Sequence, residues 1–356
     1  MVKRILMVAA VLTLSLLVGF GDLAHAQGAA MTDARFEALS KELYPKAKQE
    51  GEVIAYTVWD VEDITAILAA FSKQFPGIKT SYWAARNPEI VTKVLAEFQS
   101  DKKSFDVVMS DSAPPVLKAA GTIMPYETVQ KDVLILHDST MPVVSLQIQT
   151  LAYNTKTMKV EDLPRNWEDV ANPKYKGMVA LDDPLRAGPL TTQLAAFKEN
   201  WKDDARWTRF VKGLKALNVP VHRSSSAMFR LLVAGEYSIA EPGYLVDLLR
   251  EKEKGSPVDY VKSAPPIVSP RYSAIYAKSP HPNAAKLLAE WLISPAGQTT
   301  MDSIGREISR KGIRGRTSVE AAWSSDVKPI RATDKVFLED PKKWMDTYVK
   351  PIWEGK

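Results

Sequence analysis

The sequence predicts an α/β protein of two lobes, and three observations support that prediction. Segments typical of strands alternate with segments typical of helices over residues 52–111 and again over residues 150–244. Neighbouring parallel strands need a crossover helix, so this alternation is typical of doubly wound sheets flanked by helices. The 356 residues suffice for two such units. No glycine- and serine-rich linker separates the two stretches, which favours lobes joined by crossing strands.

The first stretch alternates strictly between the two kinds of element. In chain order we expect a strand over 52–59 (EVIAYTVW), a helix over 63–75, a strand over 78–85 (IKTSYWAA), a helix over 87–98 and a strand over 105–111 (FDVVMSD). Asp63 and Asn87 are the expected N-caps, and Pro88 is the expected first helical residue of the second helix. Pro76-Gly77 ends the first helix.

The alternation of strands and helices resumes after a less regular stretch in the middle of the chain. We expect strands over 150–158 (TLAYNTKTM), 176–184 (KGMVALDDP), 219–225 (VPVHRSS) and 237–244 (YSIAEPGY), with helices over 207–217 and after Ser226. A last clear helix carries the apolar face Leu287, Leu288, Trp291 and Leu292, and Asn283 is its expected cap. These elements predict a second α/β lobe.

The first 26 residues read as a secretory signal. A basic start is followed by an apolar run from Ile5 to Phe20 and by the small-residue cleavage site Ala24-His25-Ala26. A permanent membrane anchor is the competing interpretation, but the run is shorter than the roughly 20 apolar residues that a spanning helix needs. We therefore expect cleavage after Ala26 and export of a soluble mature chain.

Net charge and cysteine content limit the possible functions of the protein and the cellular compartments in which it could act. The net charge of +5 is mild and does not by itself indicate a nucleic-acid partner. The chain has no cysteine, which excludes disulfides, thiolate metal sites and a lipid-modified N-terminal cysteine. Together with the signal, this predicts a periplasmic protein that is not lipid-anchored. The basic run over 305–316 (GREISRKGIRGR) is expected to form a solvated face.

Known catalytic and cofactor motifs are missing. The sequence contains no G-x-S-x-G, no G-x-x-x-x-G-K-[ST], no G-x-G-x-x-G and no H-E-x-x-H. This favours binding over catalysis, and we expect no cofactor. The rival from another class is an exported enzyme that uses Asp60, Asp111 or Glu241 as acid or base.

The strongest candidate for a ligand-binding segment lies directly before the helix that is predicted to follow Ser226. Arg223, Ser224, Ser225 and Ser226 follow a predicted strand and would place a guanidinium and three hydroxyls at a helix N-terminus. Free backbone N–H groups and the positive end of the helix dipole suit an anion at such a place. The alternative is simple N-capping by one of the serines.

Further candidates lie at the ends of other predicted strands, where open α/β sheets bind their ligands. They are Trp59, Asp60, Arg86, Ser110, Asp111, Ser112, Arg186, Glu241 and Tyr244. Arg86 and Arg186 could form bidentate hydrogen bonds with a carboxylate or phosphate. The alternatives are a solvated Arg86, an ion pair of Arg186 with Asp182 or Asp183, and a Trp59 that belongs to the core.

Three segments resemble the bacterial extracellular solute-binding proteins of ABC importers, in particular the ferric-ion, polyamine, thiamine and phosphonate-binding group. They are YNTKTMKVEDLPRNWEDVANPKYKGMVALDDP (153–184), AGEYSIAEPGY (234–244) and AKSPHPNAAKLLAEWLISPAGQ (277–298). The resemblance implies a type II periplasmic-binding-protein fold, a two-lobed clamp that closes on its ligand. It implies lobe one at 31–140 plus 268–310, and lobe two at 141–267 plus 311–356. It also implies a small-molecule ligand and a permease partner in the inner membrane, for a receptor that acts as a monomer.

The resemblance leaves two kinds of ligand open. Ferric-binding members carry adjacent tyrosines near the position of EPGY, whereas here Tyr244 stands alone between Gly243 and Leu245. A small anion bound by the arginines and serines is therefore the preferred ligand, with no metal. The alternative is ferric ion, bare or complexed with an anion, held by Tyr244 and Tyr272.

Overall fold

The computed structural model describes residues 33–222, 224–323, 326–333 and 335–355. The expected signal at 1–26 and the candidate Arg223 lie outside the described residues. Within those ranges, no helix is both long and apolar enough to cross a membrane.

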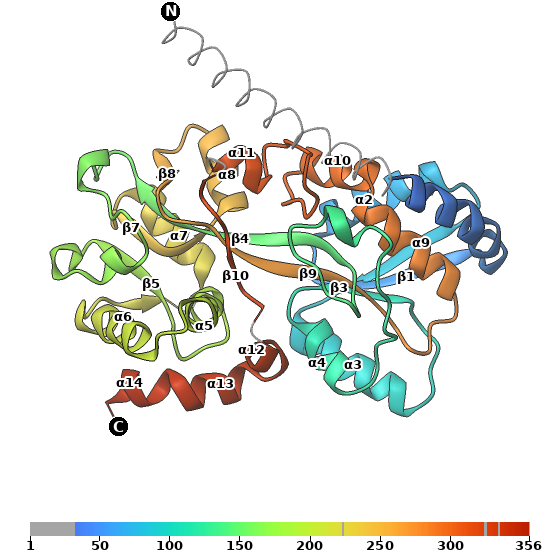
Figure 1. The fold of residues 1–356 in the computed structure, drawn as a ribbon, viewed down its shortest axis with the longest axis horizontal. Coiled ribbons are helices and arrows are strands. Elements are labelled where there is room, and N and C mark those ends of the chain that lie inside the picture. The colour runs from blue at the N-terminus through green and yellow to red at the C-terminus, as the bar shows by residue number, and fades with distance from the viewer. Residues whose placement is uncertain (1–32, 223, 324–325, 334, 356) are drawn as a thin grey trace, which may run out of the picture.

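Ten strands of the described residues form one continuous sheet. They are β1 (Glu52–Thr57), β2 (Lys79–Ala84), β3 (Val107–Ser110), β4 (Val143–Asn154), β5 (Val179–Asp182), β6 (Val221–His222), β7 (Ile239–Tyr244), β8 (Val258–Tyr260), β9 (Ile267–Ile275) and β10 (Ile330–Arg331). The order along the sheet is β2-β1-β3-β9-β4-β7-β5-β6, with β10 beside β9 and β8 beside β4. The long strands β4 and β9 run through the middle of the molecule between its two halves (Figure 1).

The direction of the strands changes at the centre of the sheet. Strand β1 is parallel to β2 and β3, and β5 is parallel to β6 and β7. Strand β9 is antiparallel to β3 and β4, and β4 is antiparallel to β7. The α/β fold, with two strand-and-helix halves joined by crossing strands, is thus confirmed. The two crossing strands are antiparallel to each other, and β9 is antiparallel to β3 and β4 to β7 and β8, whereas the short β10 is parallel to β9.

Helices cover both faces of each half. A helical segment over 33–50 precedes β1. The others are α2 (Val61–Gln74), α3 (Asn87–Gln99), α4 (Ala113–Ala119), α5 (Pro189–Trp201), α6 (Asp204–Ala216), α7 (Ser225–Ala234), α8 (Leu245–Glu253), α9 (Pro282–Ile293), α10 (Pro295–Ser303), α11 (Val319–Ala322), α12 (Lys335–Glu339), α13 (Pro341–Tyr348) and α14 (Lys350–Glu354). Short 3₁₀ helices are η1 (Lys131–Val133), η2 (Val160–Asp162), η3 (Glu168–Ala171) and η4 (Pro173–Tyr175).

Three apolar clusters hold these layers together. One joins β1 and β3 to α2 and α9, and the second joins β5 to α5, α6 and α13. The third lies on the other faces, under α3 and α4 in one half and under α7 and α8 in the other. Trp344 of α13 packs edge-to-face on Trp207 of α6 with ring centroids 6.1 Å apart. Helices α13 and α14 therefore pack on the second half, whereas α12 also packs against α4 of the first half, and the exact lobe boundaries stay a prediction.

Three predicted helix caps were misplaced. Helix α2 begins after Asp60, so Asp63 lies in its first turn, where it is buried against Arg306. Helix α3 has Arg86 at its N-cap, one residue before Asn87. Asn283 lies inside α9, whose free N–H groups are instead bonded by Glu50, at 2.8 Å from the Ala284 nitrogen.

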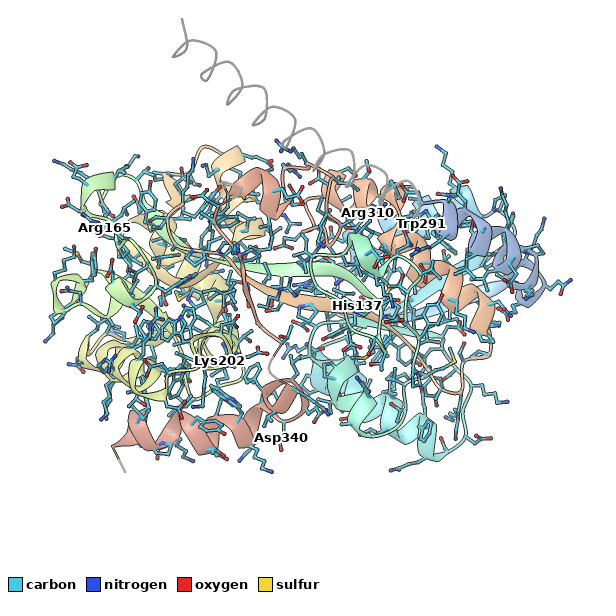
Figure 2. The ribbon with its side chains drawn as sticks, viewed as in Figure 1. His137, Arg165, Lys202, Trp291, Arg310 and Asp340 are labelled. Carbon is cyan, nitrogen blue, oxygen red and sulfur yellow. The ribbon has the colours of Figure 1, made fainter. Side chains whose placement is uncertain are left out.

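The basic run over 305–316 does not form a solvated face throughout. Arg306 is buried between Asp60 and Asp63. Arg310 is also buried; it pairs with Asp33 and donates to the carbonyl of Ile293 at 3.4 Å. Figure 2 labels Arg310, which reaches α9 through its bond to Ile293. The error arose because sequence spacing does not reveal acidic partners that lie hundreds of residues away.

Candidate functional site

The first wall of the candidate site is formed by the carboxyl ends of β1 and β2. A depression of ≈ 710 Å³ lies there, lined among others by Trp59, Asp60, Arg86 and Asn87. Trp59 is only 1% exposed, and its buried ring nitrogen has no hydrogen-bond partner among the described residues. Asp60 accepts a hydrogen bond from Arg306 at 2.7 Å. Arg86 is exposed, so its guanidinium is open to solvent.

The residues after β3 form a hydrogen-bonded network with the start of α3. Asn87 donates to the Asp111 carboxylate at 2.9 Å and accepts from the Ser110 hydroxyl, and the Ser112 N–H donates to Asp111 at 2.8 Å. Burial opposes the ionised form of Asp111. The charge of Arg271 and these hydrogen bonds outweigh it, so the pKa of Asp111 lies below its ordinary value. This wall therefore presents a fixed negative charge.

The opposite wall begins after β5, where Arg186 folds back on Asp182. The guanidinium donates to the fully buried Asp182 carboxylate at 3.1 Å, as the ion-pair alternative expected. The Arg186 Nε atom is buried and has no partner among the described residues. Burial raises the pKa of Asp182, and Arg186 partly offsets this effect. Arg186 therefore pairs with Asp182 and keeps one unused donor.

Ser224 is the N-cap of α7. Its hydroxyl accepts a hydrogen bond from the Ala227 N–H at 3.2 Å, as simple capping requires. Ser226 is exposed and Ser225 half-buried, and neither hydroxyl has a hydrogen-bond partner among the described residues. A ligand-binding role of these serines stays a prediction.

Ser224→Ala is expected to lower the free energy of unfolding by about 1 kcal/mol, because the Ala227 N–H loses its acceptor. Urea denaturation measures this, with Ser226→Ala as the control. Ser226 is exposed within α7, so its replacement should change stability by less than about 0.5 kcal/mol. Equal losses in the two variants would contradict the capping role.

Glu241 and Tyr244 lie at opposite ends of the predicted motif EPGY. Glu241 is fully buried and accepts a hydrogen bond from Gln193 of α5 at 2.6 Å. Tyr244 is half-buried at the end of β7. Burial, followed by the charge of Asp111, raises the pKa of the Tyr244 hydroxyl well above its ordinary value. Of these two candidates, only Tyr244 has a side chain open to solvent.

Arg271 on the crossing strand β9 is the residue that sequence reasoning missed. Its backbone pairs with Ser145 of β4. It comes one residue before Tyr272, the antiparallel partner of Ser110, which places it beside Asp111. Its charge acts on Asp111, Tyr244 and Asp247, which come from both halves. The Nε atom is buried without a partner. Arg271 thus lies at the centre of the candidate site.

A sequence signal for Arg271 exists. In the segment SPRYS, Ser269, Arg271 and Ser273 occupy alternate positions of a strand that is otherwise buried. Alternate residues of a strand point to the same face, so these three form one polar row. The hydroxyls of Ser269 and Ser273 are also buried, and neither has a hydrogen-bond partner within the described part of the chain. A charged residue in the middle of such a strand is a candidate for function.

Tyr272 lies on the other face of β9, because successive residues of a strand alternate. It lines a separate cavity of ≈ 190 Å³ with Pro270, Leu136 and His137. Figure 2 labels His137. The structure therefore does not bring Tyr272 to Tyr244. Within the described ranges, no three His, Asp or Glu side chains converge in a way that could hold a metal ion.

The fold and the site define a class of protein: two α/β halves on crossing strands, with polar side chains from both halves around a shared arginine. Residues 60–299 match the model of the family described as bacterial extracellular solute-binding protein. The chain belongs to this family.

Two curated relatives show how far the likeness extends. An uncharacterized protein of Haemophilus influenzae is 26% identical over 246 residues, which are 64% of this chain and 69% of the relative. The major ferric iron-binding protein of Neisseria meningitidis serogroup B is 23% identical over 291 residues, 78% of this chain and 86% of the relative.

Two solved structures share the fold. The ferric binding protein of Bordetella superimposes with a TM-score of 0.68 at 20% identity, over 85% of this chain and 98% of that one. The periplasmic binding protein AfuA of Actinobacillus pleuropneumoniae, solved with fructose-6-phosphate, gives 0.65 at 20% identity, over 84% and 98%. At such identities the likeness supports the fold and leaves the ligand open.

Proposed function

We propose that this protein is the periplasmic receptor of an ABC importer, and that it binds a small solute through its anionic group between the two lobes and delivers it to a permease. Membership of the solute-binding family supports the receptor role. Solved proteins of the same fold are described as periplasmic. The secretory signal expected at 1–26 and the absence of cysteine favour a free, unlipidated periplasmic protein. No catalytic role is proposed.

Arg271 is the residue that most strongly supports an anionic ligand. Its charge acts on groups of both halves, and its buried Nε lacks an acceptor. A buried donor without a partner is costly, and a ligand oxygen would supply the missing acceptor. In the second half, Arg186 has a buried Nε that is also without a partner among the described residues. In the first half, Arg86 has an exposed guanidinium. An anion bridging the lobes would therefore satisfy donors that the protein alone leaves unused.

Arg271→Met is expected to weaken binding of the co-purifying solute about a hundredfold, because two lost charge-assisted hydrogen bonds at about 1.5 kcal/mol each exceed two decades in affinity. The solute is first identified by mass spectrometry, and calorimetry then measures both proteins. Arg209→Met, on the exposed side of α6, is the matched control and should bind as the wild type does. Unchanged affinity in Arg271→Met would refute the proposed role.

Ferric ion is the second candidate, because several relatives and structural neighbours are named as iron-binding. The residues of the candidate site disfavour the binding of a bare ferric ion. Tyr244 has no second tyrosine beside it, and burial disfavours its phenolate. We expect that ferric citrate produces no tyrosinate-to-iron absorption band. A visible absorption scan checks this, and a strong band that disappears in Tyr244→Phe would restore the iron hypothesis.

A further inference from the structure

The cavity of ≈ 190 Å³ that Tyr272 lines is separate from the candidate site around Arg271. The two residues are neighbours on β9, so their side chains point to opposite faces of the sheet. None of the residues that form the walls around Asp60, Asp111 or Arg186 lines this cavity. It therefore needs an explanation other than the binding of the transported solute.

Three parts of the chain form the walls of the cavity. They are α4 with the residues over 136–143, the crossing strand β9, and the C-terminal segment from Thr333 into α12. This segment is fastened to the second half, because the Thr333 N–H donates to Glu199 of α5 at 3.1 Å. Helix α12 packs against α4 of the first half, and Figure 1 shows it beside α4 at the lower edge of the molecule. A molecule in the cavity would therefore join the first half to the C-terminal segment.

Apolar side chains form much of the cavity wall. They belong to Pro115, Leu136, Met141, Val143, Pro270 and Leu338. All of them are buried except Leu338 of α12, which is half-buried. An apolar cavity of about 150 Å³ binds benzene. The space therefore suits a molecule with a single six-membered ring and small substituents.

The charged side chains at the cavity already have partners of opposite charge. They form the pairs Lys118–Asp138 at 4.0 Å, Lys335–Glu339 at 3.7 Å and His137–Glu127 at 3.2 Å. An ionic ligand would have to displace one member of a pair or remain unpaired in a largely apolar space. An uncharged ligand would leave all three pairs intact, so the cavity favours an uncharged molecule.

The hydroxyl of Tyr272 is a polar group of the wall that lacks a partner. Tyr272 is only 2% exposed, and its hydroxyl forms no hydrogen bond with the described residues. Burial, followed by the charge of Asp138, raises the pKa of this hydroxyl well above its ordinary value, so the group keeps its proton. A buried donor without an acceptor is costly, and the oxygen of a ligand would supply the acceptor.

We infer that this cavity is a second binding site, for an uncharged molecule with one ring and one hydroxyl group, such as a small phenol. The ring lies against the apolar wall, and its oxygen accepts a hydrogen bond from Tyr272. The bound molecule holds α12 against α4. This inference goes beyond the proposed function and does not depend on it.

Four probes of similar size separate the ligand classes: p-cresol, toluene, benzoate and benzylamine. NMR titration of the protein measures the affinity for each. We expect p-cresol to bind about fivefold more tightly than toluene, which corresponds to one neutral hydrogen bond. Benzoate and benzylamine should bind at least about tenfold more weakly than p-cresol. Bound p-cresol should also slow the hydrogen exchange of backbone amides in α12.

Tyr272→Phe is expected to lower the affinity for p-cresol to that for toluene and to leave toluene binding unchanged. Tyr348→Phe removes the same atom from an exposed tyrosine of α13 and is the matched control. Leu338→Trp fills the cavity from α12 and should abolish the binding of both probes. If Leu338→Trp does not fold, the comparison of Tyr272→Phe with the wild type still decides the question.

Each of the other outcomes would overturn the inference. Equal affinities for p-cresol and toluene, or an unchanged p-cresol affinity in Tyr272→Phe, would remove the role of the hydroxyl. Tighter binding of benzoate or benzylamine would show an ionic site instead. Binding that survives in a folded Leu338→Trp would place the ligand outside the cavity, and no binding of any probe would mean that there is no site.

Discussion

Arg306→Met is expected to lower the free energy of unfolding by about 3 to 5 kcal/mol. The Arg306 side chain is 8% exposed and pairs with Asp60 at 2.7 Å and with the buried Asp63. Its removal leaves Asp63 as a buried carboxylate whose nearest other cation is Arg250 of α8, at 3.9 Å. Breaking a buried pair from one side is costly because the remaining charge loses both its partner and its solvation. Urea denaturation measures the loss.

Arg314→Met is the matched control, because Arg314 lies in the same basic run and is exposed. Its replacement is expected to change the unfolding free energy by no more than about 0.5 kcal/mol. The double variant Arg306→Met with Asp63→Asn should recover part of the loss, since it no longer buries an unpaired charge. Equal stability of the two single variants would mean that the ion pairs of Arg306 contribute nothing net.

The strands and helices of each half could be predicted because their signals are local. The segment over 52–59 is β-prone and buried in the structure as β1, and the helical spacing from Ile64 to Phe71 gives the buried face of α2. The crossing strand β4 was harder, because it starts at Val143, seven residues before the predicted segment at 150–158. It is buried on both faces along most of its length, so it lacks the alternation that marks a half-buried strand.

The candidate site could be predicted only where topology alone brings residues together. The carboxyl ends of parallel strands meet at one edge, so Trp59, Arg86 and Asp111 were recognisable from their positions after predicted strands. Arg271 was missed for a different reason. It lies on one of the antiparallel crossing strands, and only the pairing of β4 with β9 places it in the centre. That pairing joins segments more than a hundred residues apart, which no local pattern reveals.

Glu241, one of the predicted binding residues, is a buried carboxyl group. It is fully buried on β7, and among the described residues its carboxyl group accepts a hydrogen bond from Gln193 alone. Its second oxygen is unpartnered, as are the side-chain oxygens of Gln149 and Gln193. Burial raises the pKa of Glu241 to about 8, and the hydrogen bond from Gln193 only partly opposes this rise. The folded protein therefore holds Glu241 in its neutral form at neutral pH.

Stability is accordingly expected to fall as the pH rises from about 4.5 to about 8, because the folded state binds the Glu241 proton more tightly than the unfolded state does. One pKa unit corresponds to about 1.4 kcal/mol, so this group can account for a decrease of up to roughly 5 kcal/mol. Glu241→Gln keeps the acceptor for Gln193 and should remove this part of the pH dependence. Urea denaturation across this pH range, with the exposed Glu161→Gln as control, measures it. Parallel pH profiles of Glu241→Gln and the wild type would show that Glu241 titrates normally in the folded protein.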